Sequence, residues 1–233
     1  MKKYTDITVL VDRSGSMRSI KESMEEALNK FVEEHRHVPS SRFSLIQFDD
    51  INDHEIWCSS VPIRKAQRYI LHPRGNTPLL DAFCKAIDST GRRLRGMMEH
   101  ERPDQVLMVV ITDGAENASR QFHRQDVFDR VTHQREAYKW EFVYLGANQD
   151  TFYESQSFGI PWVNTITYTP RPEYIGLVGQ SMSQNTMSYV NRSSDHVDSF
   201  TANQRNGSAS VADRASDPVT TIVTNNDNEN NGA

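Results

Sequence analysis

The sequence predicts an α/β fold with a doubly wound, mostly parallel sheet of six strands and helices on both faces. Three observations support this prediction. Short apolar runs alternate with segments that repeat apolar residues every three or four positions. The run VLMVVIT at 106–112 is almost entirely apolar, as a strand covered on both faces requires. At 233 residues, the chain is long enough to bury the core of one such domain without disulfides.

The N-terminal pattern predicts a strand followed by a helix. DITVLV at 6–11 has the composition of a short strand that is buried on both faces. Ser19 and Glu22 are spaced as a capping box, so we expect the helix to begin at Ser19. Apolar residues then recur on one face of this helix, at Ile20, Met24, Leu28, Phe31 and Val32.

Two β-rich runs come next and predict a hairpin. They are RFSLIQF at 42–48 and HEIWCSSVPI at 54–63, and the polar turn DDIND separates them. A hairpin reverses the direction of the chain, so the second of these strands would lie antiparallel at one edge of the sheet.

From Pro78 onward, helices and strands alternate regularly. A helix beginning near Pro78 carries Leu80, Phe83, Ile87 and Leu94 on one side. After the strand at 106–112, we expect helices at 125–138, 151–158 and from 173 to about 190, with strands at 141–146 and 162–168.

The composition changes after residue 190. Residues 191–233 are rich in Asn, Ser, Asp and Thr, and Phe200 is their only aromatic residue. Such a segment buries too little apolar surface to offset the entropy lost on ordering. We therefore expect a domain at 1–190 and a polar, low-complexity C-terminal tail at 191–233 that is mostly disordered, with 219–223 as a candidate short strand or docking motif.

Charge and cysteine content narrow the class of protein. The net charge of -5 comes without a basic block, which argues against nucleic acid as a partner. Cys58 and Cys84 belong to no metal-binding or redox spacing and are expected to be buried, reduced thiols. No run resembles a signal peptide or a membrane span, so we expect a soluble, cytoplasmic protein without a membrane partner.

Oxygen-bearing side chains occupy three loops at the expected ends of strands or starts of helices. Asp12, Ser14 and Ser16 follow the first strand, Thr77 stands where the second helix begins, and Asp113 follows the strand at 106–112. Because the carboxyl ends of parallel strands open into one crevice, we expect these residues to converge.

Two carboxylates and three hydroxyls suit a hard divalent cation such as Mg²⁺, with Mn²⁺ or Ca²⁺ as alternatives. If the loop is extended, Asp12, Ser14 and Ser16 lie on one side of it, and Arg13 and Gly15 face away. The three hydroxyls add no negative charge, so the ion would still attract a carboxylate from outside. The pattern therefore predicts a site that binds an acidic residue of another protein.

The segment DRSGS at 12–16 has the pattern D-x-S-x-S, and it resembles the metal-ion-dependent adhesion site of von Willebrand factor type A (VWA) domains. Thr77 and Asp113 match that family's second-loop threonine and third-loop aspartate, and the order of elements is similar over roughly residues 4–190. The resemblance implies a Rossmann-like fold and a metal contacted by the serines and the threonine, with the aspartates acting directly or through water. It also implies a partner-binding rim of Met17, Asn76, Gly114, Ala115 and Glu116.

Each of these residues also has an ordinary structural explanation. Thr77 before Pro78 is a good N-cap, and Asp113-Gly114 is a common turn pair. The combination of these residues favours the metal site, because otherwise several unrelated capping and turn residues would have to fall at the same edge of the sheet by chance. The histidines form no zinc-binding spacing, and His35 and His37 are expected to be exposed. The tryptophans, at 57, 140 and 162, are expected to pack in the core or at sheet edges.

An enzymatic alternative treats Asp12 as the nucleophile of a haloacid-dehalogenase-like, Mg²⁺-dependent phosphatase. That chemistry needs a carboxylic acid two residues further on, where this chain has Ser14. No phosphate-binding loop or GxSxG elbow occurs either. We therefore expect no enzyme.

The expected function is that of a metal-dependent adaptor that captures an Asp or Glu of a partner protein, with an ATPase as one candidate partner. The alternative is a phage virion or adhesion component that uses the same site. The compact, single-module form suggests a bacterial or bacteriophage source.

Overall fold

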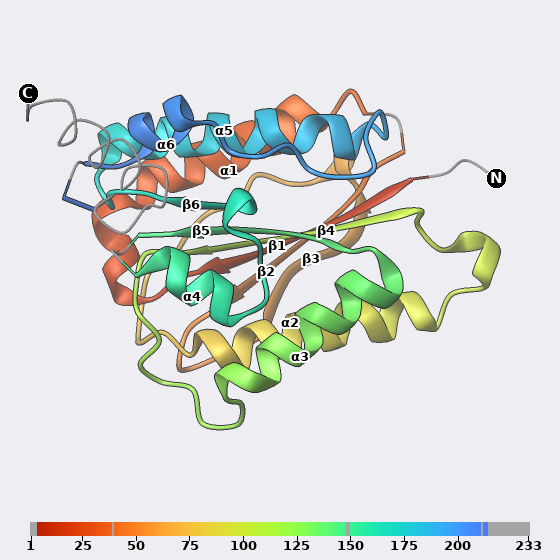
Figure 1. Ribbon diagram of the computed structural model, residues 1–233, viewed down its shortest axis with the longest axis horizontal. Coiled ribbons are helices and arrows are strands. Elements are labelled where there is room, and N and C mark those ends of the chain that lie inside the picture. Colours follow the sequence, from red (N-terminus) through yellow and green to blue (C-terminus); the bar gives the residue numbers. More distant parts are fainter. Residues whose placement is uncertain (1–3, 39, 148–149, 211, 214–233) are drawn as a thin grey trace, which may run out of the picture.

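The computed structural model describes residues 4–38, 40–147, 150–210 and 212–213. Its sheet has six strands in the order β3-β2-β1-β4-β5-β6 (Figure 1). All neighbouring strands pair in parallel except β2 and β3, which are antiparallel, and β3 forms one edge. The predicted fold class is confirmed. The strands are β1 (Thr5–Asp12), β2 (Arg42–Phe48), β3 (Glu55–Pro62), β4 (Gln105–Thr112), β5 (Glu141–Gly146) and β6 (Thr165–Thr167).

Helices cover both faces of this sheet (Figure 1). One face carries α1 (Lys21–His35), α5 (Pro172–Val190) and α6 (Ala202–Ser208), and the other carries α2 (Leu79–Arg95), α3 (Arg124–Tyr138) and α4 (Thr151–Ser157). In the described part of the chain, four short 3-10 helices join these elements: η1 (Gly15–Ile20), η2 (Ile63–Lys65), η3 (Glu99–Glu101) and η4 (Trp162–Asn164).

The central strand β1 is buried along its whole length. Successive side chains of a strand point to opposite faces, so Ile7 and Val9 pack in the layer of α1 and α5, whereas Leu10 packs in the layer of α2 and α3. Burying each such side chain stabilises the fold by about 1.5–3 kcal/mol. This two-sided burial explains why the strand sequences are continuously apolar.

Strand order reverses between β1 and β4, and such a reversal creates a crevice at the carboxyl ends of the two strands. Val11 pairs with Ile111, which places Asp12 next to Thr112. The loops that leave β1 and β4 therefore start side by side, at the end of the molecule opposite the N-terminus (Figure 1).

The capping box that was expected at Ser19 and Glu22 is wrong. The chain turns into η1 before α1, which begins at Lys21, and the Ser19 hydroxyl donates to the Ser16 carbonyl at 3.3 Å. The last strand is also shorter than expected, because 162–164 form η4.

His35 is buried rather than exposed, because α5 packs over the end of α1. Its ring is 0% exposed, and Nδ1 lies 2.8 Å from the Phe31 carbonyl. Burial lowers the pKa of His35, so the ring is neutral near pH 7. The expected packing is confirmed for two of the tryptophans: Trp140 is in the core, and Trp57 contacts Tyr69 edge-to-face at the sheet edge. It is wrong for Trp162, which is 38% exposed and lies in η4.

The ordered domain extends beyond residue 190, so the expected boundary there is wrong. Val197 and Phe200 join the core under α5. The Arg205 guanidinium is buried, donates to the carbonyls of Trp162 and Thr165, and lies over aromatic rings. A few anchoring side chains thus fix a segment whose average composition is polar. The candidate strand at 219–223 lies outside the described residues.

Truncation after Val190 is expected to destabilise the domain. The loss of Val197 and Phe200 alone removes about 3 kcal/mol or more of burial, which lowers the melting temperature of a domain of this size by at least about 6 °C. Calorimetry of this truncation, with the chain ending at Asp213 as the reference, measures the effect. Equal melting temperatures would contradict the packing of 197–205.

Candidate metal centre

All five residues of the expected metal site lie at the carboxyl edge of the parallel strands. Asp12 ends β1, and Asp113 directly follows β4. Ser14 precedes η1, Ser16 lies within it, and Thr77 stands just before the Pro78 N-cap of α2. Asp12, Ser14 and Thr77 are buried, whereas Ser16 is exposed and Asp113 is half-buried.

Short distances join the oxygens of these residues. The Ser14 and Ser16 hydroxyls lie 2.9 Å apart, and the Ser16 hydroxyl donates to Asp113 Oδ1 at 2.7 Å. Asp12 Oδ1 accepts the Ser14 N–H at 2.7 Å. A methyl group added at Gly114 would lie 3.2 Å from Thr77 Oγ1 and 3.5 Å from Ser16 Oγ, so these two hydroxyls flank the same glycine. The structure therefore brings the five residues together.

The spacing of these oxygens fits a small, hard cation. In an octahedral shell with bonds of 2.0–2.1 Å, adjacent oxygens lie about 2.9 Å apart. The spacings of 2.9 Å and 2.7 Å at Ser16 are close to this value. No group of three or more His, Cys, Asp or Glu side chains suited to a metal occurs among the described residues.

The surroundings of the two carboxylates disfavour their negatively charged forms, and a nearby cation would favour those forms. Burial raises the pKa of Asp12 to about 7, hydrogen bonds from Ser14 and Thr112 oppose this rise, and the charge of Asp113 adds to it. Burial also raises the pKa of Asp113 to about 6, against the hydrogen bond from Ser16. Buried acids that lie close together favour a bound positive charge.

The geometry of the loop differs from the extended backbone that was expected. Ser14 is extended, with φ −59° and ψ 167°, but Gly15–Ile20 forms the 3-10 helix η1. The hydroxyls of Ser14 and Ser16 therefore meet because the chain turns, and not because two strand-like residues face the same side. Arg13 faces away from the other residues, as expected.

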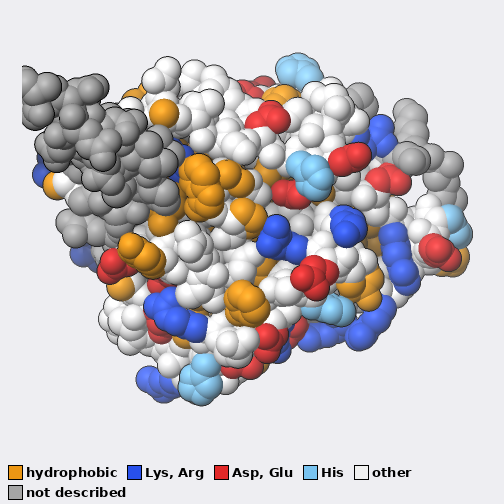
Figure 2. All heavy atoms as spheres, viewed as in Figure 1, with side chains coloured by type: hydrophobic (Ala, Val, Ile, Leu, Met, Phe, Trp, Pro, Cys, Tyr) orange, Lys and Arg blue, Asp and Glu red, His pale blue; other side chains and the backbone are white. Residues whose placement is uncertain are grey.

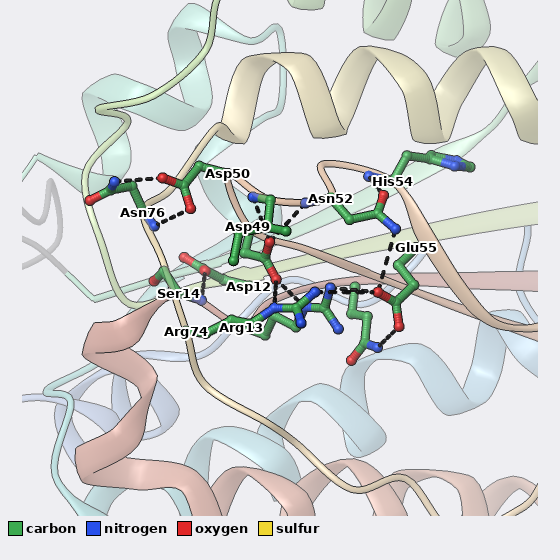
Figure 3. Close-up of polar contacts among 12 residues, drawn as sticks. Asp12, Arg13, Ser14, Asp49, Asp50, Asn52, His54, Glu55, Arg74 and Asn76 are labelled. Carbon is green, nitrogen blue, oxygen red and sulfur yellow. Dashed lines mark hydrogen bonds and ion pairs between the residues drawn. The ribbon is translucent and has the colours of Figure 1, made fainter.

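Arg13 belongs to a partly buried polar network that spacing along the sequence does not reveal (Figure 3). Its guanidinium pairs with Asp49 and donates to Glu55 Oε2 at 2.6 Å, and Arg74 Nε donates to Asp49 at 2.8 Å. Asp49 is 0% exposed and directly follows β2. The rule that singled out Asp12 and Asp113 at strand ends also applies to Asp49, but the segment DDIND was interpreted only as a hairpin turn.

This network holds the first loop against the segment that carries Thr77. The Arg74 N–H donates to the Arg13 carbonyl at 2.7 Å, and the Gly15 N–H donates to the Gly75 carbonyl at 2.9 Å. Burial alone would raise the pKa of Asp49, but hydrogen bonds from Arg74 and the backbone, together with the charge of Arg13, bring it below its ordinary value. Asp49 is therefore a stable anion between two guanidinium groups.

The expected rim is only partly at the surface. Asn76 and Ala115 are exposed, and Gly114 is half-buried. Met17 is 0% exposed and packs in the core, because η1 turns it inward, so its assignment to the rim is wrong.

The Glu116 carboxylate has a structural role that its position in the sequence did not indicate: it accepts hydrogen bonds from the backbone. One carboxylate oxygen accepts the Leu80 N–H at 3.0 Å, in the first turn of α2, and the other accepts the N–H groups of Ala118 and Ser119 at 2.9 and 2.7 Å. The carboxylate thus ties the loop after β4 to the start of α2. The predicted N-cap at Thr77 is not formed, since Pro78 is the N-cap residue.

The sequence matches the model of a known family of protein domains. Residues 6–159 match the model of the von Willebrand factor type A domain. None of the curated protein sequences matches the chain. No helix among the described residues is long and apolar enough to cross a membrane.

Solved structures with the same fold come from distant proteins. One is the proximal thread matrix protein 1 of the mussel byssus, solved with zinc in its MIDAS (metal-ion-dependent adhesion site) motif. It has 14% identity and a TM-score of 0.55, over 80% of this chain and 48% of that one. The PilB minor pilin of Streptococcus sanguinis has 9% identity and a TM-score of 0.54, over 82% and 63%. Manganese-loaded TRAP of Plasmodium vivax has 17% identity and a TM-score of 0.50, over 72% and 69%. The chain thus spans about half the length of the mussel protein.

Replacing Gly75 by alanine is expected to strain the loop that carries Thr77. Gly75 has a φ of +68°, and an added Cβ would lie 2.0 Å from Asp50 Oδ1. The expected loss is about 1–3 kcal/mol of unfolding free energy, measured by denaturant unfolding. Gly15→Ala is the matched control, since its added Cβ meets only the Gly75 carbonyl at an ordinary 3.4 Å. Equal losses in the two variants would show that Gly75 is not required.

Proposed function

The chain belongs to the von Willebrand factor type A domain family, and we propose that it is a divalent-metal-dependent protein-binding module. Its metal-ion-dependent adhesion site consists of Asp12, Ser14, Ser16, Thr77 and Asp113. The observation that carries this proposal is the cluster of oxygens 2.7–2.9 Å apart at the β1 and β4 ends, with two carboxylates of raised pKa.

Each residue has a role in this proposal. Ser14, Ser16 and Thr77 supply neutral oxygens, and Asp12 and Asp113 supply the negative charge, directly or through water. When bound, the ion supplies a positive charge that a carboxylate of a partner can contact. The exposed Ser16 and the half-buried Asp113 mark the open side of the site, since Asp12, Ser14 and Thr77 are buried beneath them. A partner Asp or Glu would therefore approach from the side of Ser16.

A binding role accounts for the site better than catalysis does. A phosphatase that used Asp12 as its nucleophile would need a general acid at position 14. Ser14 stands there, and its hydroxyl lies 2.9 Å from that of Ser16. An aliphatic hydroxyl is too weak an acid for that role. We therefore propose that the chain is not an enzyme.

Mg²⁺ is the ion that we propose, because the donors are all hard oxygens. The mussel structure contains zinc and the Plasmodium structure contains manganese, and these ions are findings about those two proteins. The proposed partner is a protein that presents an Asp or Glu, with an ATPase as one candidate.

An adaptor and an adhesion component would use the same site, so the two roles differ in the cellular compartment and not in the site. Cys58 and Cys84 are free thiols, and Cys84 is 0% exposed. Reduced cysteines are typical of proteins in reducing compartments. This observation supports the proposal of a cytoplasmic adaptor over a component exposed outside the cell.

Asp12→Ala and Ser16→Ala are each expected to weaken binding of Mg²⁺ or Mn²⁺ at least tenfold, about 1.4 kcal/mol, because each removes an oxygen from the site. Titration calorimetry measures the affinity, and circular dichroism checks that each variant is folded. Ser19→Ala is the matched control, since Ser19 lies in η1 and, among the described residues, its hydroxyl bonds only to the backbone carbonyl of Ser16. Undiminished affinity in a folded Asp12 or Ser16 variant would refute the assignment of the site.

Capture of a partner is expected to require the metal. A host protein retained by the chain in Mg²⁺ should be released by a chelator and should not be retained by Thr77→Ala. Replacing the partner's contacting acid by its amide should abolish retention as well. A partner that binds the metal-free domain equally well would place the contact surface elsewhere.

A further inference from the structure

Thr77 combines a backbone that is held on both sides with a hydroxyl that has no hydrogen-bond partner. The residue is 2% exposed. Within the part of the chain that the structure describes, only its backbone N–H and C=O form hydrogen bonds. Leaving a largely buried hydroxyl unpaired is unfavourable, so such groups in folded proteins usually have a partner. The free hydroxyl therefore points to a ligand.

The space beside Gly114 gives access to this hydroxyl. An atom at the Cβ position of Gly114 would lie 3.2 Å from Thr77 Oγ1 and 3.5 Å from Ser16 Oγ. Apart from its neighbours in the chain, it would lie within 4 Å of no other described atom. The Thr77 hydroxyl thus borders open space that a second member of the proposed metal site also borders.

The Thr77 backbone is held by Asn117, which lies on the loop after β4. The Thr77 N–H donates to the Asn117 side-chain Oδ1 at 2.9 Å, and the Asn117 N–H donates to the Thr77 carbonyl at 3.1 Å. One residue thus satisfies both backbone groups of Thr77. Asn117 is exposed, so its side chain contributes little to the hydrophobic core.

Two covalent features limit the remaining freedom of Thr77. Because Pro78 follows, the Thr77 backbone is restricted mainly to extended conformations. Because the side chain is branched at Cβ, few χ1 rotamers are available to it. With both backbone groups held by Asn117, little freedom remains in the direction of the hydroxyl.

The neighbours of Asn117 in the sequence anchor the same loop to α2 instead. Glu116 accepts the Leu80 N–H at 3.0 Å, and Ser119 Oγ accepts the Asp81 N–H at 3.1 Å. N–H groups in the first turn of a helix have no partner within the helix, so these contacts satisfy the start of α2. Asn117 differs from both neighbours because it contacts a residue of the proposed metal site.

The wider surface offers no obvious alternative source of attraction for a cation. Among the described side chains on the face shown in Figure 2, acidic and basic groups are interspersed rather than gathered by sign. A cation therefore gains little from the charge of that face. Its affinity for the proposed site depends on how the oxygens of the site are placed.

We propose that Asn117 is a positioning residue of the metal site, which orients the Thr77 hydroxyl toward the ion by holding the Thr77 backbone. This role rests on the proposed function, since the orientation of Thr77 matters only if its hydroxyl binds an ion. Residues that orient the ligands of a metal typically change the affinity by about 10–100-fold when they are replaced.

The test is a double-mutant cycle on Mn²⁺ affinity, measured by titration calorimetry of the full chain. Asn117→Ala removes the acceptor of the Thr77 N–H and should weaken binding roughly tenfold. Thr77→Ala keeps the other four residues of the site and should still bind weakly. Because Asn117 acts through Thr77, the double variant should bind no more weakly than Thr77→Ala alone.

Ser119→Ala is the matched control for Asn117→Ala. Ser119 lies on the same loop and contacts Glu116 and the start of α2, but it has no hydrogen bond to Thr77 in the described part of the chain. This variant should bind Mn²⁺ like the wild type. Melting curves in metal-free buffer confirm that each variant is folded.

Hydrogen exchange of the Thr77 amide, followed by NMR in metal-free buffer, is an independent readout of the same contact. Exchange should be faster in Asn117→Ala, because the amide has lost its acceptor. It should stay near the wild-type rate in Asn117→Asp, which keeps an acceptor oxygen at the same position. Equal exchange rates in Asn117→Ala and the wild type would overturn the positioning role.

The affinities separate failure of this role from failure of the proposed function. Unchanged affinity in Asn117→Ala, or equal losses in Asn117→Ala and Ser119→Ala, would overturn the role of Asn117 alone. Losses that multiply in the double variant would also overturn it, because Asn117 would then act independently of Thr77. Undiminished affinity in Thr77→Ala would refute the proposed metal site, and the role of Asn117 with it.

Discussion

The pairing of β1 with β4 determines the rest of the candidate site. The two strands are parallel neighbours at the point where the strand order reverses, so the loops after Asp12 and Thr112 leave the sheet side by side. Two carboxylates, those of Asp12 and Asp113, are consequently near enough for their charges to interact, and burial favours the neutral form of each. In the proposed function, a cation would resolve this conflict, and the neighbouring hydroxyls would complete its donor set.

The surrounding network keeps these loops in place without taking part in the cluster. Asp49, at the end of β2, is held between Arg13 and Arg74, and backbone hydrogen bonds join the first loop to the segment before α2. Glu116 fixes the loop after β4 from the other side. The loops that carry Ser14, Ser16 and Thr77 are therefore held by neighbouring groups whose hydrogen bonds are made within the chain.

The features predicted from the sequence are those that depend on local pattern. Continuous apolar runs identified the parallel strands, and oxygen side chains after two strands and before one helix identified the five residues of the cluster. Some failures are local, because η1 turns Met17 into the core and replaces the expected capping box at Ser19. The others depend on contacts between distant segments: His35 is covered by α5, and Phe200 and Arg205 anchor a segment that is polar on average. Glu116 binds the start of α2, which spacing along the chain does not indicate.

The most direct test of the central claim is a crystal structure of the chain grown with Mn²⁺, with anomalous diffraction to locate the ion. If these residues bind the ion, one strong anomalous peak is expected within direct bonding distance of the Ser14 and Ser16 hydroxyls, between the ends of β1 and β4. A structure with the same fold but no peak at that position, or with manganese bound only elsewhere, would contradict the assignment of the metal site.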